Sequence, residues 1–94
     1  MFIVILRFSE GKAKAGQFLK AHNEWLQRGF GDGVFVLAGS LQDNAGGAIV
    51  ARCASREDLN ARLNADPFVA EGIVRVEILG VIPSKTDERL DFLK

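Results

Sequence analysis

The chain has 94 residues, enough for one domain and too few for separate binding and catalytic domains. Its twelve basic and twelve acidic side chains cancel without forming a run, which argues against nucleic acid or a membrane surface as a partner. The single cysteine, Cys53, excludes an internal disulfide and fits a reducing, cytoplasmic compartment. The apolar N-terminal run is much shorter than the ~20 residues of a membrane span and has no basic leader, so we expect a strand there.

Hydrophobic spacing predicts the first half of the fold. Residues 2–8 are β-branched and aromatic, as in a buried strand. Apolar residues at intervals of three and four then predict a helix over 15–29. Residues 34–41 are typical of a second strand, and the turn-forming residues 43–47 lead into a third strand at 48–54, its antiparallel neighbour.

Capping residues mark the second half. Ser55 is suited to the N-cap of a second helix, and the Asp-Pro pair at 66–67 opens a further short helical turn that Gly72 closes. Alternating residues predict a final strand over 73–82. The charged segment 84–94 is expected to form a short C-terminal helix.

This order defines a single α+β domain over 1–94, with the ferredoxin-like βαββαβ arrangement and a four-stranded antiparallel sheet. Right-handed crossovers place both helices on one face of the sheet. Regular alternation in the second strand would put Phe35 and Leu37 on the same side, and both sides of the first two strands are apolar. We therefore expect a homodimer that covers the second face. The alternative is a monomer whose terminal segment folds over it, although the charge of that segment disfavours this.

His22 is the only histidine, and it lies on the apolar side of the first predicted helix. It is either a core residue with one polar partner or a general acid or base. Asp66 is the natural second member, because the ends of the two helices lie on the same side of the sheet. Capping alone also explains an aspartate before a proline. The hypothesis is a pair in which Asp66 orients the imidazole of His22.

Four further residues are candidates for substrate binding. Gly39 and Ser40, late in the second strand, leave space beside the imidazole, and Ser40 either donates to a bound oxyanion or caps the strand end. Arg7 and Arg75 lie within strands, where they form ion pairs at the sheet edge or bind a carboxylate. We expect neither a metal nor an organic cofactor.

Three segments resemble the YCII-related family: Ala21-His22, the strand Val36-Leu37-Ala38-Gly39, and Asn64-Ala65-Asp66-Pro67-Phe68-Val69 followed by Gly72. The resemblance implies a dimeric α+β barrel with an active site built around a histidine and an aspartate, which match His22 and Asp66. One type of member resembles a dehydrochlorinase that acts on chlorinated muconate-like acids, but an activity does not transfer with a fold.

Two positions depart from the family pattern. Members often carry an arginine where this chain has Leu19, and a proline where it has Ser40. A substrate carboxylate would then need Arg7 or Arg75.

Two hypotheses follow. The first is a lyase or isomerase-like enzyme that uses the pair for elimination or isomerisation of a small organic acid. The second is a non-catalytic dimeric module that binds a small ligand or a partner and has a side-chain-filled interior.

Overall fold

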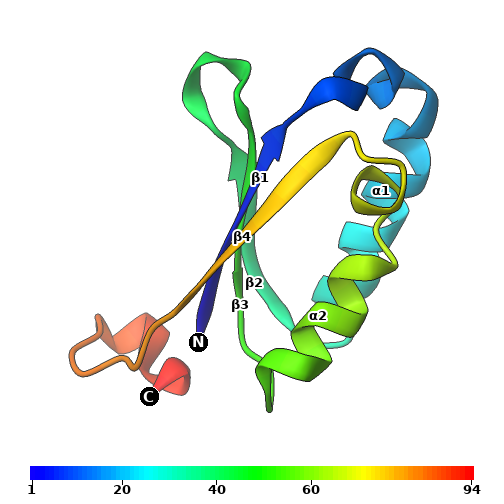
Figure 1. Ribbon diagram of the computed structural model, residues 1–94. Helices are drawn as coiled ribbons and strands as arrows, with labels where there is room; N and C mark the ends of the chain where they lie inside the picture. The colour runs from blue at the N-terminus through cyan, green and yellow to red at the C-terminus, as the bar shows by residue number, and fades with distance from the viewer.

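A computed structural model describes the whole chain, residues 1–94, and confirms the ferredoxin-like α+β fold (Figure 1). The strands β1 (Phe2–Phe8), β2 (Phe35–Ser40), β3 (Gly46–Ala51) and β4 (Val74–Gly80) form one antiparallel sheet in the order β2-β3-β1-β4. The helices α1 (Ala15–Gly31), α2 (Arg56–Asn64) and α3 (Pro67–Ala70) all lie on one side of it. Short 3₁₀ helices occupy η1 (Glu10–Lys14), η2 (Gln42–Asn44) and η3 (Glu88–Leu93).

The predicted capping residues are confirmed. The side chain of Ser55 accepts a hydrogen bond from the backbone N–H of Asp58 at 3.1 Å and begins α2. Asp66 begins α3 in the same way, with Pro67 in the first turn. Gly72 ends this segment with a φ of 69°, a left-handed conformation that glycine adopts without steric cost.

The core lies between the helices and the inner face of the sheet. Trp25 of α1 is buried, and its ring N–H donates to the backbone carbonyl of Arg62 in α2 at 2.9 Å. This bond ties the end of α2 to the middle of α1 and thereby places α3 beside α1. The other fully buried apolar side chains are Val4, Ile49, Ala51, Leu59, Leu63 and Ile73.

A β-bulge between Phe35 and Leu37 corrects the predicted alternation of β2. Phe35 pairs with Ala51 and is buried on the inner face, whereas Leu37 pairs with Val50 and is 55% exposed on the outer face. The extra residue, Val36, reverses the phase of the strand. A regular period of two cannot reveal such an insertion.

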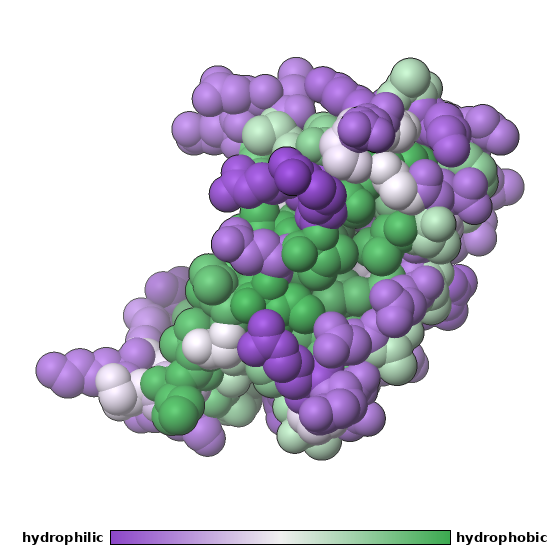
Figure 2. Space-filling view, viewed as in Figure 1, coloured by the Kyte–Doolittle hydropathy of each residue, from purple (hydrophilic) through white to green (hydrophobic).

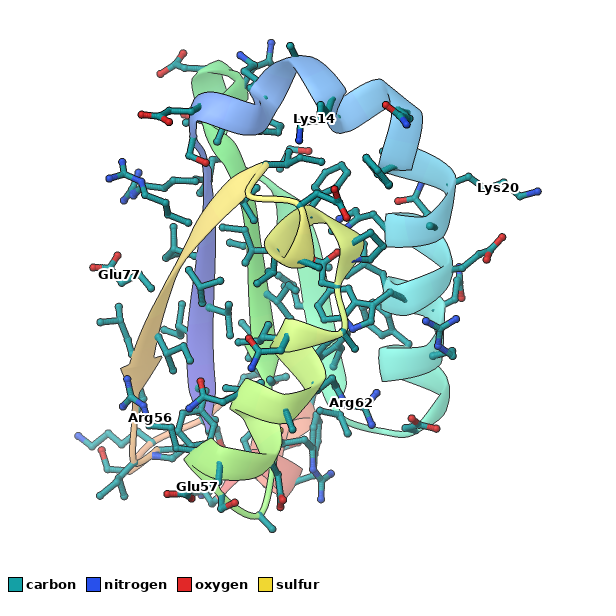
Figure 3. The ribbon with its side chains drawn as sticks, turned by 45° about the vertical axis from the view of Figure 1, so that its right-hand side comes forward. Lys14, Lys20, Arg56, Glu57, Arg62 and Glu77 are labelled. Carbon is teal, nitrogen blue, oxygen red and sulfur yellow. The ribbon has the colours of Figure 1, made fainter.

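The outer face of the sheet has no cover within the chain. The pairing register places there the side chains of Ile3 and Ile5 from β1 and of Val50 from β3, together with Leu37. Glu77 of β4 also points away from the helices (Figure 3). We name these five residues the outer sheet face. The view in Figure 2 shows a hydrophobic band over β4 that continues to the base of the C-terminal segment.

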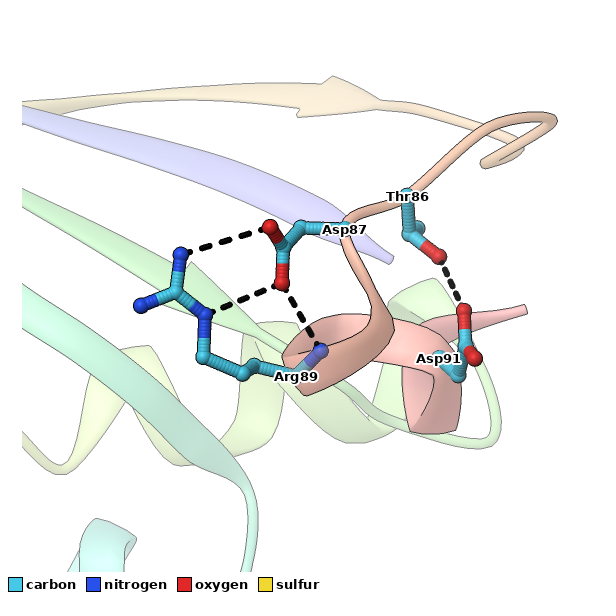
Figure 4. Close-up of polar contacts among 4 residues, drawn as sticks. All are labelled: Thr86, Asp87, Arg89 and Asp91. Carbon is cyan, nitrogen blue, oxygen red and sulfur yellow. Dashed lines mark hydrogen bonds and ion pairs between the residues drawn. The ribbon is translucent and has the colours of Figure 1, made fainter.

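Within the segment 84–94, where a short helix was expected, Glu88–Leu93 form a 3₁₀ helix. Polar contacts within it hold its shape: Thr86 donates to Asp91 at 2.6 Å, and Arg89 bonds Asp87 through its backbone and its guanidinium (Figure 4). The Arg89 guanidinium lowers the pKa of the Asp87 carboxyl, and Asp87 in turn raises the pKa of Arg89. The segment lies beyond one end of the sheet and leaves the outer sheet face uncovered.

Strand ends differ slightly from the predicted ones. The third strand begins at Gly46, which pairs with Arg7, and ends at Ala51, which pairs with Phe2. The final strand ends at Gly80 rather than at residue 82. None of the helices combines the length and apolarity needed to cross a membrane.

Candidate active site

A cavity of about 290 Å³ lies between α1 and the inner face of the sheet. Its walls are mainly apolar, with contributions from Leu6, Ala38 and Phe68. Three polar side chains line it as well: His22, Asn23 and Ser40. Its size is near the lower end of the roughly 300–1,000 Å³ of small-molecule sites, and its lining of apolar walls with a few polar groups is typical of them.

His22 and Asp66 are in direct contact. The Nδ1 atom of His22 lies 2.7 Å from Oδ1 of Asp66, although the two residues come from α1 and from the start of α3. The His22 side chain is 13% exposed and that of Asp66 is fully buried. The contact that the sequence only made plausible is therefore present.

Asp66 has a second hydrogen-bond partner besides His22. Oδ1 of Asp66 also accepts the backbone N–H of Phe68 at 3.0 Å. When Asp66 is ionised its carboxylate only accepts hydrogen bonds, so Nδ1 of His22 is then the donor. In the neutral ring this leaves the lone pair on Nε2, which has no hydrogen-bond partner in the chain.

Two aromatic rings flank the imidazole of His22. The Phe68 ring stacks on it with centroids 4.0 Å apart and planes 7° from parallel. The Trp25 ring lies 5.8 Å away at 28°. The imidazole is therefore held by one hydrogen bond and one close stack while it lines the cavity.

The second oxygen of Asp66, Oδ2, is buried and has no hydrogen-bond partner. A buried polar atom without a partner is costly, and such atoms are rare in folded proteins. Oδ1 carries both of the hydrogen bonds that this carboxylate accepts.

Gly39 and Ser40 line the same cavity as His22. The bulge in β2 places Ser40 opposite Gly47 on the inner face, where the backbone of β3 bears no side chain to fill the space. Ser40 makes no side-chain hydrogen bond within the chain, so its hydroxyl is free for a ligand.

Arg7 and Arg75 do not lie with this group. They are direct cross-strand neighbours, and the register turns both side chains to the outer side of the sheet, away from the cavity. Neither forms an ion pair within the chain, so the expected ion pairs are absent as well. Side chains alternate between the two faces along β1, so Arg7 points outward as Ile3 and Ile5 do, two and four positions before it.

Two residues of this site, Asn23 and Phe68, were not predicted from the sequence. Asn23 follows His22 and lines the cavity, but an asparagine on the polar side of a helix gives no signal of its own. Phe68 was noted only as part of a motif, and its stacking on His22 depends on a contact between distant segments.

Cys53 lies outside the cavity. Burial raises the pKa of its thiol, and the nearby Arg62 lowers it by a smaller amount. No group of three or more His, Cys, Asp or Glu side chains is arranged to hold a metal ion.

The fold and the lined cavity define a small ferredoxin-like α+β domain with one candidate ligand site. The model of the YCII-related domain matches residues 1–82, and the chain belongs to that family. No curated protein sequence matches the chain.

One solved structure of similar fold is 5-chloro-2-hydroxyhydroquinone dehydrochlorinase (TftG) from Burkholderia phenoliruptrix AC1100, in complex with 2,5-dihydroxybenzoquinone. The similarity has a TM-score of 0.72 and covers 89% of this chain and 96% of that chain, at 14% sequence identity. At this identity the likeness shows the shared fold.

Proposed function

We propose that this protein is a cofactor-independent enzyme that uses His22 for acid–base chemistry on a small organic molecule. The observation that carries the proposal is the contact of His22 with the buried Asp66 beside a lined cavity. A histidine held by a carboxylate through Nδ1 presents a basic Nε2 to a ligand. General acid–base catalysis of this kind contributes a factor of about 10² to 10⁴ in rate.

The reaction class follows from the groups available. In an elimination, Nε2 of His22 takes a proton from a carbon beside a carbonyl, which in an enol or phenol substrate is the carbonyl of its keto tautomer. The electron pair of that C–H bond forms the new double bond, and the leaving group departs with its own bonding pair. In an isomerisation the same nitrogen returns the proton to another carbon. Asp66 orients the ring and stabilises its charged form in both cases.

Ser40 and Asn23 supply the polar groups for the substrate oxygen. Both line the cavity with His22, and a hydroxyl and an amide can donate to an oxygen on which negative charge develops. Gly39 leaves room beside them.

The cavity favours one kind of organic acid. No lysine or arginine lines it, so the cavity offers a substrate carboxylate no permanently charged partner. We therefore propose a substrate whose acidity comes from an enol or phenol. The structural neighbour, a dehydrochlorinase bound to a dihydroxybenzoquinone, supports this class.

The test compares the wild-type protein with His22→Ala on enols and hydroxylated quinones. Chloride release from 5-chloro-2-hydroxyhydroquinone and exchange of carbon-bound hydrogen in D₂O report the two reactions. We expect His22→Ala to lower the rate by about 10² to 10⁴. Unchanged turnover in this variant would refute the mechanism. Binding of 2,5-dihydroxybenzoquinone without any exchange or elimination would favour the ligand-binding module.

We also propose that the active species is a homodimer paired through the outer sheet face. Ile3, Ile5, Val50 and Leu37 would be buried between the two sheets, as an apolar face of this kind requires. Arg7, Arg75 and Glu77 lie on the same face and would bring charges of both signs to this interface. The catalytic pair comes from one subunit.

A further inference from the structure

We propose that Phe68 is a positioning residue that keeps His22 aligned with Asp66, a role that rests on the proposed acid–base function. The residue acts on both members of the pair: its ring contacts the imidazole of His22, and its backbone N–H binds the carboxylate of Asp66.

The first contact restricts the imidazole. A ring at 4.0 Å and 7° from parallel blocks any tilt of the His22 ring toward α3. The hydrogen bond to Asp66 restricts rotation within the ring plane, because turning the ring moves Nδ1 away from Oδ1. Together the two contacts leave one orientation for Nε2. The face of an aromatic ring also attracts cations, which suits the charged imidazole formed when His22 takes a proton.

The second contact restricts the carboxylate. Phe68 donates its N–H to the same oxygen, Oδ1, that accepts from His22. This bond selects Oδ1 as the atom that faces the histidine and leaves Oδ2 without a partner. Both hydrogen bonds of the carboxylate therefore converge on the oxygen that faces His22.

Phe68 and Phe35 both belong to the hydrophobic core, but only Phe68 stacks on His22. Phe35 is buried to a similar degree, but it meets Trp25 edge-on, at 63° and 5.0 Å, and does not contact His22. Phe68 lines the cavity and lies flat on the one side chain proposed to move a proton. The two phenylalanines therefore form a matched pair for experiment.

The test uses Phe68→Leu, with Phe35→Leu as the control and Phe68→Tyr as the conservative variant. Leucine keeps the backbone N–H and much of the volume but removes the flat ring. Because His22 is the only histidine, its ring protons and nitrogens are unambiguous in ¹H–¹⁵N NMR spectra. In the wild type we expect the Nδ1-protonated pattern and ring protons shifted upfield by the stacked phenyl ring.

In Phe68→Leu we expect the upfield shift to disappear, the Nδ1-protonated fraction to fall, and kcat to fall by roughly tenfold to a hundredfold from misplacement of the base. Phe68→Tyr keeps a flat ring and should retain the upfield shift, the Nδ1-protonated fraction and kcat of the wild type. Phe35→Leu should lower thermal stability and leave the His22 spectrum unchanged.

The proposal fails if the wild-type ring protons show no upfield shift, or if Phe68→Leu matches Phe35→Leu in spectrum and kcat. The upfield shift is measured on the wild-type protein, so the proposal can be refuted even if Phe68→Leu does not fold. If His22→Ala retains turnover while Phe68→Leu alters the His22 spectrum, the acid–base function is wrong and the positional role of Phe68 stands.

Discussion

At the scale of single residues, Asp66 concentrates its contacts on one oxygen. Oδ1 accepts from Phe68 and from His22, whereas Oδ2 is buried without a partner. An amide in place of the carboxylate can keep both bonds, with its oxygen at Oδ1 and its NH₂ group at the position of Oδ2. Charge and geometry at this site are therefore separable by one substitution.

We predict that Asp66→Asn changes the free energy of unfolding by about 1 kcal/mol or less, because both hydrogen bonds persist. Turnover should still fall, by roughly tenfold to a hundredfold, because the charged imidazole loses its counter-charge. Urea denaturation and steady-state kinetics measure the two effects. Asp66→Ala is the comparison: it also removes the helix cap and should cost about 1 kcal/mol more. Equal activity of Asp66→Asn and the wild type would contradict a role for the charge.

Sequence reasoning reached these two residues through their types and their neighbours. His22 was the only imidazole and lay among apolar residues, and Asp66 preceded a proline. The same reasoning grouped Arg7 and Arg75 with the site, and the register placed them on the other side of the sheet. Charge alone does not reveal the face that a strand residue occupies until the register is known.

At the scale of elements, α1 packs closely against β2 at Gly29. A Cβ atom added at this position would overlap the ring of Phe35, which is itself buried. The glycine is therefore required by the close approach of the helix to the strand.

We predict that Gly29→Ala lowers the free energy of unfolding by about 1–3 kcal/mol through overpacking. Gly16→Ala is the matched control, since Gly16 lies in the same helix and a Cβ there meets no atom within 4 Å. That variant should be neutral or more stable by up to about 1 kcal/mol. Chemical denaturation of both proteins is the measurement, and equal losses in the two would refute the packing argument.

Helices and caps were largely predictable because their signals are local. Ser55, Asp66 and Gly72 mark chain positions at which backbone groups need a partner or a left-handed turn. The bulge in β2 was not predictable, because it depends on how β2 pairs with β3 rather than on a local residue preference.

At the scale of the whole molecule, the exposed apolar side chains of the outer sheet face are the basis of the proposed homodimer. We predict that the wild-type protein sediments with twice the mass of one chain at micromolar concentration, and that Leu37→Asp sediments as a monomer because it places a charge in the proposed interface. Leu19→Asp is the control, since Leu19 is similarly exposed at 49% but lies on α1. A wild-type mass equal to one chain would contradict the dimer.

The ferredoxin-like α+β class and the order of strands and α-helices are confirmed, since they follow from the spacing of apolar residues, whereas the 3₁₀ helices η1 and η2 were not predicted. The path of the C-terminal segment was harder to predict from the sequence, because its shape depends on contacts such as that between Thr86 and Asp91. The segment also lies beyond residue 82, the last residue that the family model matches. Ile82, the last matched residue, is an apolar side chain that is 95% exposed.

The extra residue in β2 also bears on how relatives of this chain should be compared. Phe35 and Ser40 are five positions apart, an odd separation that would send them to opposite sides of a regular strand. The bulge lets one serve the core and the other the cavity. In a relative without the insertion, the core residue and the cavity residue of this strand share the inner face only if they are an even number of positions apart. Ungapped alignment across this strand would then equate positions that face the cavity with positions on the outer face of the sheet, and a single gap at Val36 restores the correspondence.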